Sequence, residues 1–169
     1  MRVAAWLAWM AVWVFPTTTM QAGGVPSDKT PPTLLTVRLP TSVRKRIERT
    51  VFGDEGLDSY AQTDDEKTTE AVRVSLGPDS RPGLRVRSGH QRCGATGNCV
   101  WWIFDPATGS ALLNDGLGCQ LRFLATLHHG LYDVKITQNL SCCDGVNHIY
   151  HFDGQQYRQV REQAYSVKQ

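Results

Sequence analysis

The sequence has almost no excess of charge of either sign, and this bears on the partners it can bind. It contains 18 lysines and arginines against 16 aspartates and glutamates, a formal net charge of +2 at pH 7. Arg2 lies in a segment that we expect to be removed, so the mature net charge falls to +1. Binding to nucleic acid depends on a basic excess that displaces counterions from phosphates. The composition therefore predicts no nucleic-acid partner.

Motifs that mark common enzyme classes are also missing. We find no glycine-rich phosphate loop, no internal repeat and no linker to a second domain. No serine or cysteine lies in a recognisable nucleophile elbow, and covalent catalysis needs a nucleophile held beside a base. After the N-terminal leader, no segment is long and apolar enough to cross a bilayer. The sequence thus predicts one domain with no catalytic residues, no bound metal and no cofactor.

The first 24 residues have the pattern of a secretory signal peptide. Arg2 is followed by an apolar run from Val3 to Phe15, which is too short to span a membrane comfortably. Ala22-Gly23-Gly24 offers a cleavage site, so the mature chain is expected to begin at Val25, with cleavage two residues earlier as an alternative. We therefore expect a periplasmic or secreted protein with no stable membrane insertion after cleavage; the other interpretation is an uncleaved anchor.

The cysteines of an exported chain are expected to form disulfides, and there are five of them: Cys93, Cys99, Cys119, Cys142 and Cys143. Cys93 and Cys99 enclose a short loop with two glycines and an asparagine, residues that tolerate tight turns, so we expect them to pair. Cys119 is expected to join Cys142 or Cys143, which leaves one thiol over. A bridge between the adjacent Cys142 and Cys143 is a strained alternative.

The pattern of apolar residues predicts an α+β fold dominated by antiparallel strands. Val43, Ile47 and Val51 form one stripe of a short N-terminal helix. After it, apolar and polar residues alternate in seven to eight short segments joined by tight turns, which forces antiparallel pairing. We expect an antiparallel β-meander, curled or closed into a half-barrel, in one disulfide-stabilised domain over residues 41–162. Residues 25–40 are expected to be a flexible lead and residues 163–169 a flexible tail.

The predicted turns are marked by glycine, proline, asparagine and aspartate between the strand patterns. They comprise Asp105–Gly109, Asn114–Gly116, His128–Gly130, Asp144–Gly145 and Asp153–Gly154. The last of these is the strongest hairpin signal in the chain.

Cys142, Cys143, His148 and His151 carry donor groups that suit zinc or copper. Adjacent cysteines present both sulfurs poorly to one tetrahedral ion. His148 and His151 are expected to point to opposite faces of a strand, because side chains alternate along it. We therefore predict a disulfide and two ordinary strand histidines there, and no metal site.

Two other polar clusters contain side chains that can bind metal ions. His128-His129 has the chemistry of a metal ligand or a base, but its position beside Gly130 predicts an exposed turn. Asp64-Asp65-Glu66, with Glu70 beyond, has carboxylates for calcium but lacks the glycine that turns a calcium loop. Neither cluster is predicted to bind an ion.

The strand from Val100 to Phe104 follows the predicted disulfide loop directly. Trp101 and Trp102 are expected to point to opposite faces of this strand. A tryptophan exposed beside the loop would serve as a binding anchor, since such aromatics often dominate interface energy; burial of both is the other interpretation. We take Thr96, Asn98, Trp101 and Trp102 as the candidate interaction surface.

The order of motifs carries a resemblance to a group of proteins. A Cys-Gly-x-x-Gly-x-Cys loop at Cys93 to Cys99 enters an aromatic strand, and a Tyr-x-Phe-Asp-Gly-x-x-Tyr hairpin follows at Tyr150 to Tyr157. Over roughly residues 70–160 the chain resembles a loose group of small secreted or periplasmic proteins of Gram-negative bacteria with no assigned activity. These motifs are folding devices, so the resemblance implies a compartment and a fold but no catalytic residue.

These observations together predict an exported, non-enzymatic binding or interaction protein of the bacterial envelope, whose partner is an envelope protein. An inhibitor of a wall-degrading hydrolase is one concrete form of this hypothesis. The alternative is a small periplasmic hydrolase, or a redox or metal-binding protein, that uses His128 and His129 or Cys142 and Cys143.

Overall fold

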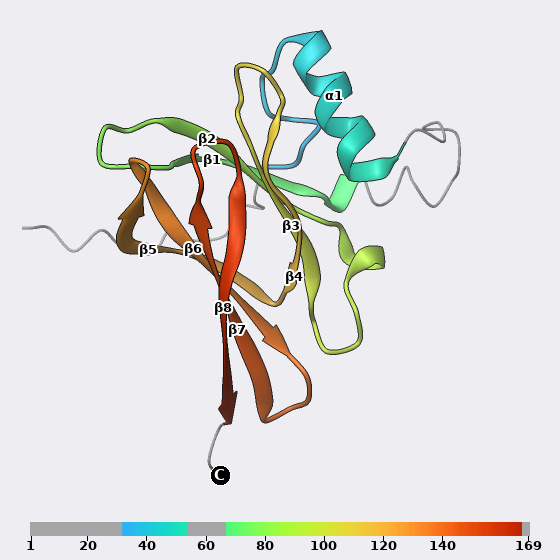
Figure 1. Ribbon diagram of the computed structural model, residues 1–169. Coiled ribbons are helices and arrows are strands. Elements are labelled where there is room, and N and C mark those ends of the chain that lie inside the picture. Colours follow the sequence, from blue (N-terminus) through green and yellow to red (C-terminus); the bar gives the residue numbers. More distant parts are fainter. Residues whose placement is uncertain (1–31, 54–66, 167–169) are drawn as a thin grey trace, which may run out of the picture.

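The computed structural model describes residues 32–53 and 67–166, which form one α-helix and two antiparallel sheets (Figure 1). Sheet A has the strand order β1-β2-β3-β4, and sheet B has the order β5-β6-β7-β8. The expected signal peptide and the Asp64-Asp65-Glu66 cluster lie outside the described residues. The elements are α1 (Thr41–Phe52), β1 (Glu70–Ser75), β2 (Pro82–Arg87), the short 3-10 helix η1 (His90–Arg92), β3 (Cys99–Phe104), β4 (Ala111–Gly118), β5 (Gln120–His128), β6 (Leu131–Asn139), β7 (Asp144–Phe152) and β8 (Tyr157–Ser166).

The helix and the antiparallel strands confirm the predicted class, but the strands form two sheets and not one curled meander. The chain changes sheet at Cys119, whose backbone N–H donates to the Thr137 carbonyl of β6 at 2.8 Å. The turn predicted at Asn114–Gly116 is also wrong. Asp115 has a positive φ of 55° inside β4, and the β3–β4 register shifts beside it. These residues therefore form a β-bulge within one continuous strand.

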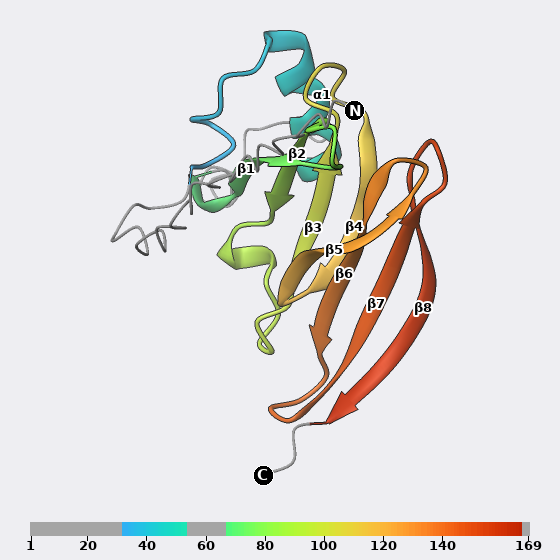
Figure 2. The same ribbon diagram turned by 90° about the vertical axis from the view of Figure 1, so that its left-hand side faces the viewer.

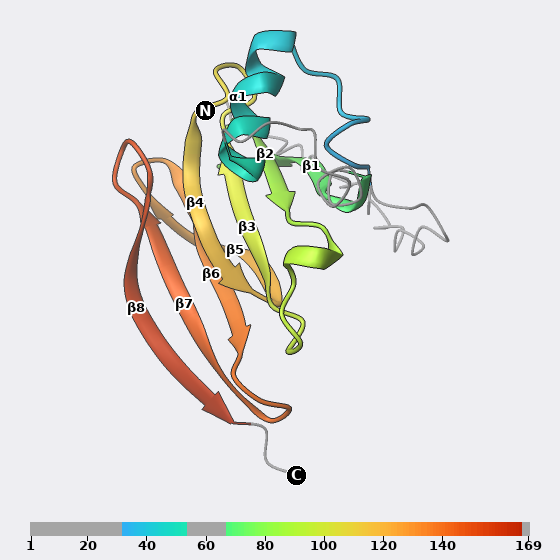
Figure 3. The ribbon, with the colours of Figure 1, turned by 90° about the vertical axis from the view of Figure 1, so that its right-hand side faces the viewer.

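Two apolar cores separate three layers, which are seen edge-on in Figures 2 and 3. Side chains alternate along β3, so Trp101 and Ile103 face the core shared with sheet B, whereas Trp102 and Phe104 face the core under α1. The order is therefore α1, sheet A, sheet B. Among the described residues, no helix or strand covers the face of sheet B that points away from sheet A, which we call the outer face (Figure 3).

Both predicted flexible ends need correction where they are described. Leu34 and Val37 are buried, and the Arg44 guanidinium donates to their two carbonyls at 2.7 and 2.6 Å. The lead therefore packs on the domain from residue 32 onward. At the other end β8 continues to Ser166, because its backbone pairs with β7 as far as Asp144. Residues 163–166 are strand, not tail.

Asp153 holds the β7–β8 hairpin closed, as its turn signal predicts. Its Oδ1 accepts the backbone N–H groups of Gln156 and Gln155, each at 2.8 Å, and its Oδ2 accepts Arg158 Nε at 3.1 Å. These hydrogen bonds, Gln156 first, lower the Asp153 pKa from 3.8 to about 2.

We expect Asp153→Asn to be less stable than the wild type at neutral pH, with the difference disappearing in acid. A carboxylate whose folded pKa is depressed adds stability above its unfolded pKa and loses it as pH falls through the folded value. The window here is therefore from about pH 4 down to about pH 2. Thermal unfolding of both chains across this range measures the effect. Identical pH dependence of the two melting temperatures would contradict it.

Candidate functional site

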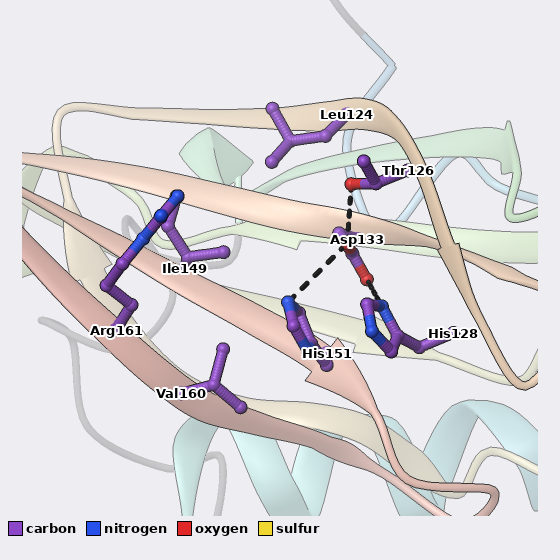
Figure 4. A pocket seen from close by; sticks show the side chains of 8 residues that line it. All are labelled: Leu124, Thr126, His128, Asp133, Ile149, His151, Val160 and Arg161. Atoms are coloured by element: carbon purple, nitrogen blue, oxygen red, sulfur yellow. Dashed lines mark hydrogen bonds and ion pairs between the residues drawn. The ribbon is translucent and has the colours of Figure 1, made fainter.

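Two histidines converge on one buried aspartate on the outer face of sheet B (Figure 4). Asp133 lies on β6, between His128 at the end of β5 and His151 on β7. Nδ1 of His128 is 2.7 Å from Oδ1 of Asp133, and Nε2 of His151 is 3.6 Å from Oδ2. Three strands thus deliver one side chain each to a single point on the open face.

Hairpin register explains why these residues meet. His129 and Gly130 both adopt positive φ, at 49° and 80°, and form a tight turn that places His128 opposite Leu131. Val134 pairs with Tyr150 in the β6–β7 ladder, so the residues next to them, Asp133 and His151, lie side by side. Because Val134 points into the core, alternation sends Asp133 to the outer face.

Asp133 is only 1% exposed although it faces outward. The Thr126 hydroxyl donates to its Oδ2 at 2.5 Å, and His128 covers its Oδ1. Burying a carboxylate raises the free energy of the folded state unless the group is paired and hydrogen-bonded. Thr126 and His128 provide these interactions. Burial raises the pKa of the Tyr157 hydroxyl, and the charge of Asp133 raises it further.

Thr126 and His128 already satisfy the buried carboxylate of Asp133, so the imidazole of His151 is an additional polar group at this point. The rings of His128 and His151 stack with their centroids 3.5 Å apart and their planes 13° from parallel. Both rings are partly open to solvent, with side chains 43% and 33% exposed. The arrangement therefore offers two imidazole nitrogens and one carboxylate at an accessible position.

The three donors have spacings close to those of a metal site. One ligand atom from each of His128, Asp133 and His151 lies within 4.8 Å of the others. Zinc with bonds of about 2.0–2.2 Å to nitrogen and oxygen has neighbouring ligand atoms roughly 3.4 Å apart. In the structure Nδ1 of His128 lies 2.7 Å from Oδ1 of Asp133 and Nε2 of His151 lies 3.6 Å from Oδ2, so each imidazole contacts a different carboxylate oxygen. The two rings are stacked nearly parallel, so they would have to turn toward each other for one nitrogen of each to bind the same ion as the carboxylate.

The cluster forms one end of a pocket of about 490 Å³. Leu124, Ile149 and Val160 form its apolar wall, and Arg161 lines the opposite end (Figure 4). Ile149 is buried although it is on the outer face. A ligand at the cluster would therefore have a hydrophobic surface beside it.

The positions of the histidines in the structure test the predictions made for them from the sequence. His148 approaches Gln138 and Glu162, whereas His151 faces Asp133, so the two rings lie on opposite faces of β7 as predicted. His129 occupies the predicted exposed turn. The prediction that His128 belongs to this turn is wrong, because His128 ends β5 and contacts Asp133. Asp133 was missed as a site residue because its alternation pattern marks it as an ordinary outward polar residue.

The disulfide between Cys93 and Cys99 is present, with the sulfurs 2.03 Å apart. The bridge expected from Cys119 to Cys142 or Cys143 is not formed. Cys119 Sγ lies 3.2 Å from the Thr137 carbonyl in mid-strand, whereas Cys142 and Cys143 lie beyond the end of β6 with their sulfurs 3.0 Å apart. The contact with Cys143 raises the pKa of the Cys142 thiol, which disfavours the thiolate that a metal would need.

The candidate interaction surface is largely buried and needs correction. Trp101, Trp102 and Asn98 are 6%, 2% and 6% exposed. Trp101 and Trp102 fill the two cores, and Asn98 joins the disulfide loop to sheet B: its amide donates to the Asn139 carbonyl and its Oδ1 accepts the Asn139 N–H. Only Thr96 remains exposed. The loop therefore has a structural role in docking sheet A on sheet B.

No protein-family model, curated protein or solved structure matches the chain. Among the described residues, no helix is long and apolar enough to span a membrane.

Proposed function

We propose that the protein is an exported binding protein that holds a divalent transition-metal ion such as Zn²⁺ through His128, Asp133 and His151. The observation that carries this proposal is the convergence of two imidazoles on one buried carboxylate at an open face. Imidazole and carboxylate are ordinary zinc ligands. The proposal keeps the predicted class of binding protein and moves its working surface from the disulfide loop to the outer face of sheet B.

The surroundings of the cluster support a metal ligand set. Thr126 orients the Asp133 carboxylate through its hydroxyl, the kind of hydrogen bond that fixes metal ligands in place. Three protein ligands leave at least one coordination position open, and the pocket lies beside it. A metal ion there would replace the proton between His128 and Asp133 and balance the buried charge. We infer that the bound ion presents its open position to a ligand from solution.

Export is supported by two independent features of the chain. The first 24 residues have the pattern of a signal peptide, and Cys93–Cys99 is a disulfide, a bond that persists in oxidising compartments. A periplasmic or secreted location also exposes the site to metal ions and small molecules outside the cytoplasm.

Zinc titration of the purified protein tests the proposal. We expect one Zn²⁺ per chain by isothermal titration calorimetry, and an affinity for His151→Ala that is lower by about 100-fold. The matched control is His148→Ala, on the same strand but the opposite face, which should bind zinc as the wild type does. Affinity should also fall as pH is lowered, because protons compete for the ligands. A wild-type chain without zinc affinity, or an unaffected His151→Ala variant, would refute the site.

A further inference from the structure

Arg161 places a positive group in the same pocket as the histidine cluster. It lies on β8 opposite Ile149 of β7, and its side chain extends along Ile149 at the end of the pocket away from His128 (Figure 4). Among the described residues, its guanidinium makes no hydrogen bond or ion pair. Arg158, three residues earlier on the same strand, pairs with Asp153. Arg161 is thus a cation facing a pocket with no carboxylate of the described chain against it.

With a divalent metal ion bound at the histidine cluster, the charges in the pocket indicate which ligand charges it would attract. A divalent ion on the Asp133 carboxylate leaves one net positive charge at one end, and Arg161 adds another at the other end. Between them lie the apolar side chains of Leu124, Ile149 and Val160. Two positive ends separated by a hydrocarbon wall complement a molecule with two negative ends and an apolar middle.

We propose that the metal-loaded pocket binds a small aliphatic dicarboxylate. One carboxylate occupies the open position of the ion held by His128, Asp133 and His151, and the other pairs with Arg161. Carboxylate oxygens are zinc ligands, and the planar guanidinium fork matches a carboxylate in two parallel hydrogen bonds. The methylene chain lies against Ile149 and Val160. This inference rests on the proposed metal site and names the ligand class of that site.

Calorimetry on the zinc-loaded protein tests the ligand class, with a series of straight-chain dicarboxylates and the monocarboxylates of equal length as probes. At one favoured chain length we expect the dicarboxylate to bind at least about tenfold more tightly than its monocarboxylate, because a charge-assisted pair with arginine is gained. The zinc-free protein should show no such preference.

The variant that isolates Arg161 is Arg161→Gln. It should lose the preference for dicarboxylates, and zinc titration of the variant should still show one ion per chain. Arg158→Gln is the matched control and should keep the preference, because Arg158 pairs with Asp153 instead. Equal binding of both carboxylate series by the zinc-loaded wild type, or a preference that survives in Arg161→Gln, would overturn this inference and leave the metal site standing. A wild-type chain that binds no zinc would overturn both.

Discussion

Asp133→Asn is expected to lower zinc affinity by about 100-fold or more while the chain still folds. The amide keeps the size of the side chain, and its oxygen can still accept from Thr126, so the packing under the cluster is retained. It removes the single negative charge that two imidazoles and a divalent ion share. Zinc titration monitored by calorimetry measures the affinity, and far-UV circular dichroism checks the fold.

Two further variants show whether the loss comes from the ligand itself. Thr126→Val removes the hydrogen bond that orients Asp133 and should weaken zinc binding by about 10–100-fold. Asp153→Asn removes an exposed carboxylate from the neighbouring hairpin and should leave zinc binding unchanged. An Asp133→Asn protein that binds zinc as tightly as the wild type would show that the ion, if bound, is held elsewhere.

Gly118→Ala is expected to destabilise the fold by about 3 kcal/mol, which lowers the melting temperature by roughly 10 °C for a domain of this size. Gly118 is the last residue of β4, where sheet A meets sheet B. A Cβ atom there would lie 2.5 Å from the Thr137 carbonyl oxygen and 2.5 Å from Cγ2 of Ile136. The Thr137 carbonyl cannot move away without breaking a hydrogen bond, because it accepts the Cys119 N–H at 2.8 Å. Thermal denaturation measures the effect.

Gly94→Ala is the matched control for the glycine effect. Gly94 has a φ that any residue adopts, and its nearest neighbours to an added Cβ are 3.9 Å away. Its substitution should change stability by less than about 0.5 kcal/mol. If the two alanine variants melt at the same temperature, the close approach of the two sheets at Gly118 is not a feature of the folded protein.

The strands could be predicted from the sequence because their signals are local. Alternation in β2 and β6 and the turn at Asp153-Gly154 each depend on neighbouring residues. The division into two sheets depends on Cys119 pairing with Thr137, a contact between strands that no local pattern reports. The prediction of a turn at Asn114–Gly116 was wrong for a related reason. The residue types that form a turn also form a β-bulge, and here the pairing of Gly116 with Trp101 across the strands makes the segment a bulge.

The site was harder to predict because its residues come from three strands. The turn at His129-Gly130 fixes the β5–β6 register, so the proximity of His128 to Asp133 could have been inferred from it. The contact with His151 depends on the length of the β6–β7 connection, and the turn was expected at Asp144-Gly145, which lies inside β7. A turn at Asp144-Gly145 would leave His151 out of register with Asp133, whereas the observed pairing of Val134 with Tyr150 brings them side by side.

X-ray absorption at the zinc edge of the zinc-loaded protein tests the central claim most directly, because the chain offers both imidazoles and thiols as ligands. We predict scattering from two imidazole rings and at least one oxygen at about 2.0–2.2 Å, with the imidazole signal reduced in His151→Ala. A shell of sulfur at about 2.3 Å would place the ion on the cysteines and contradict the assignment to His128, Asp133 and His151.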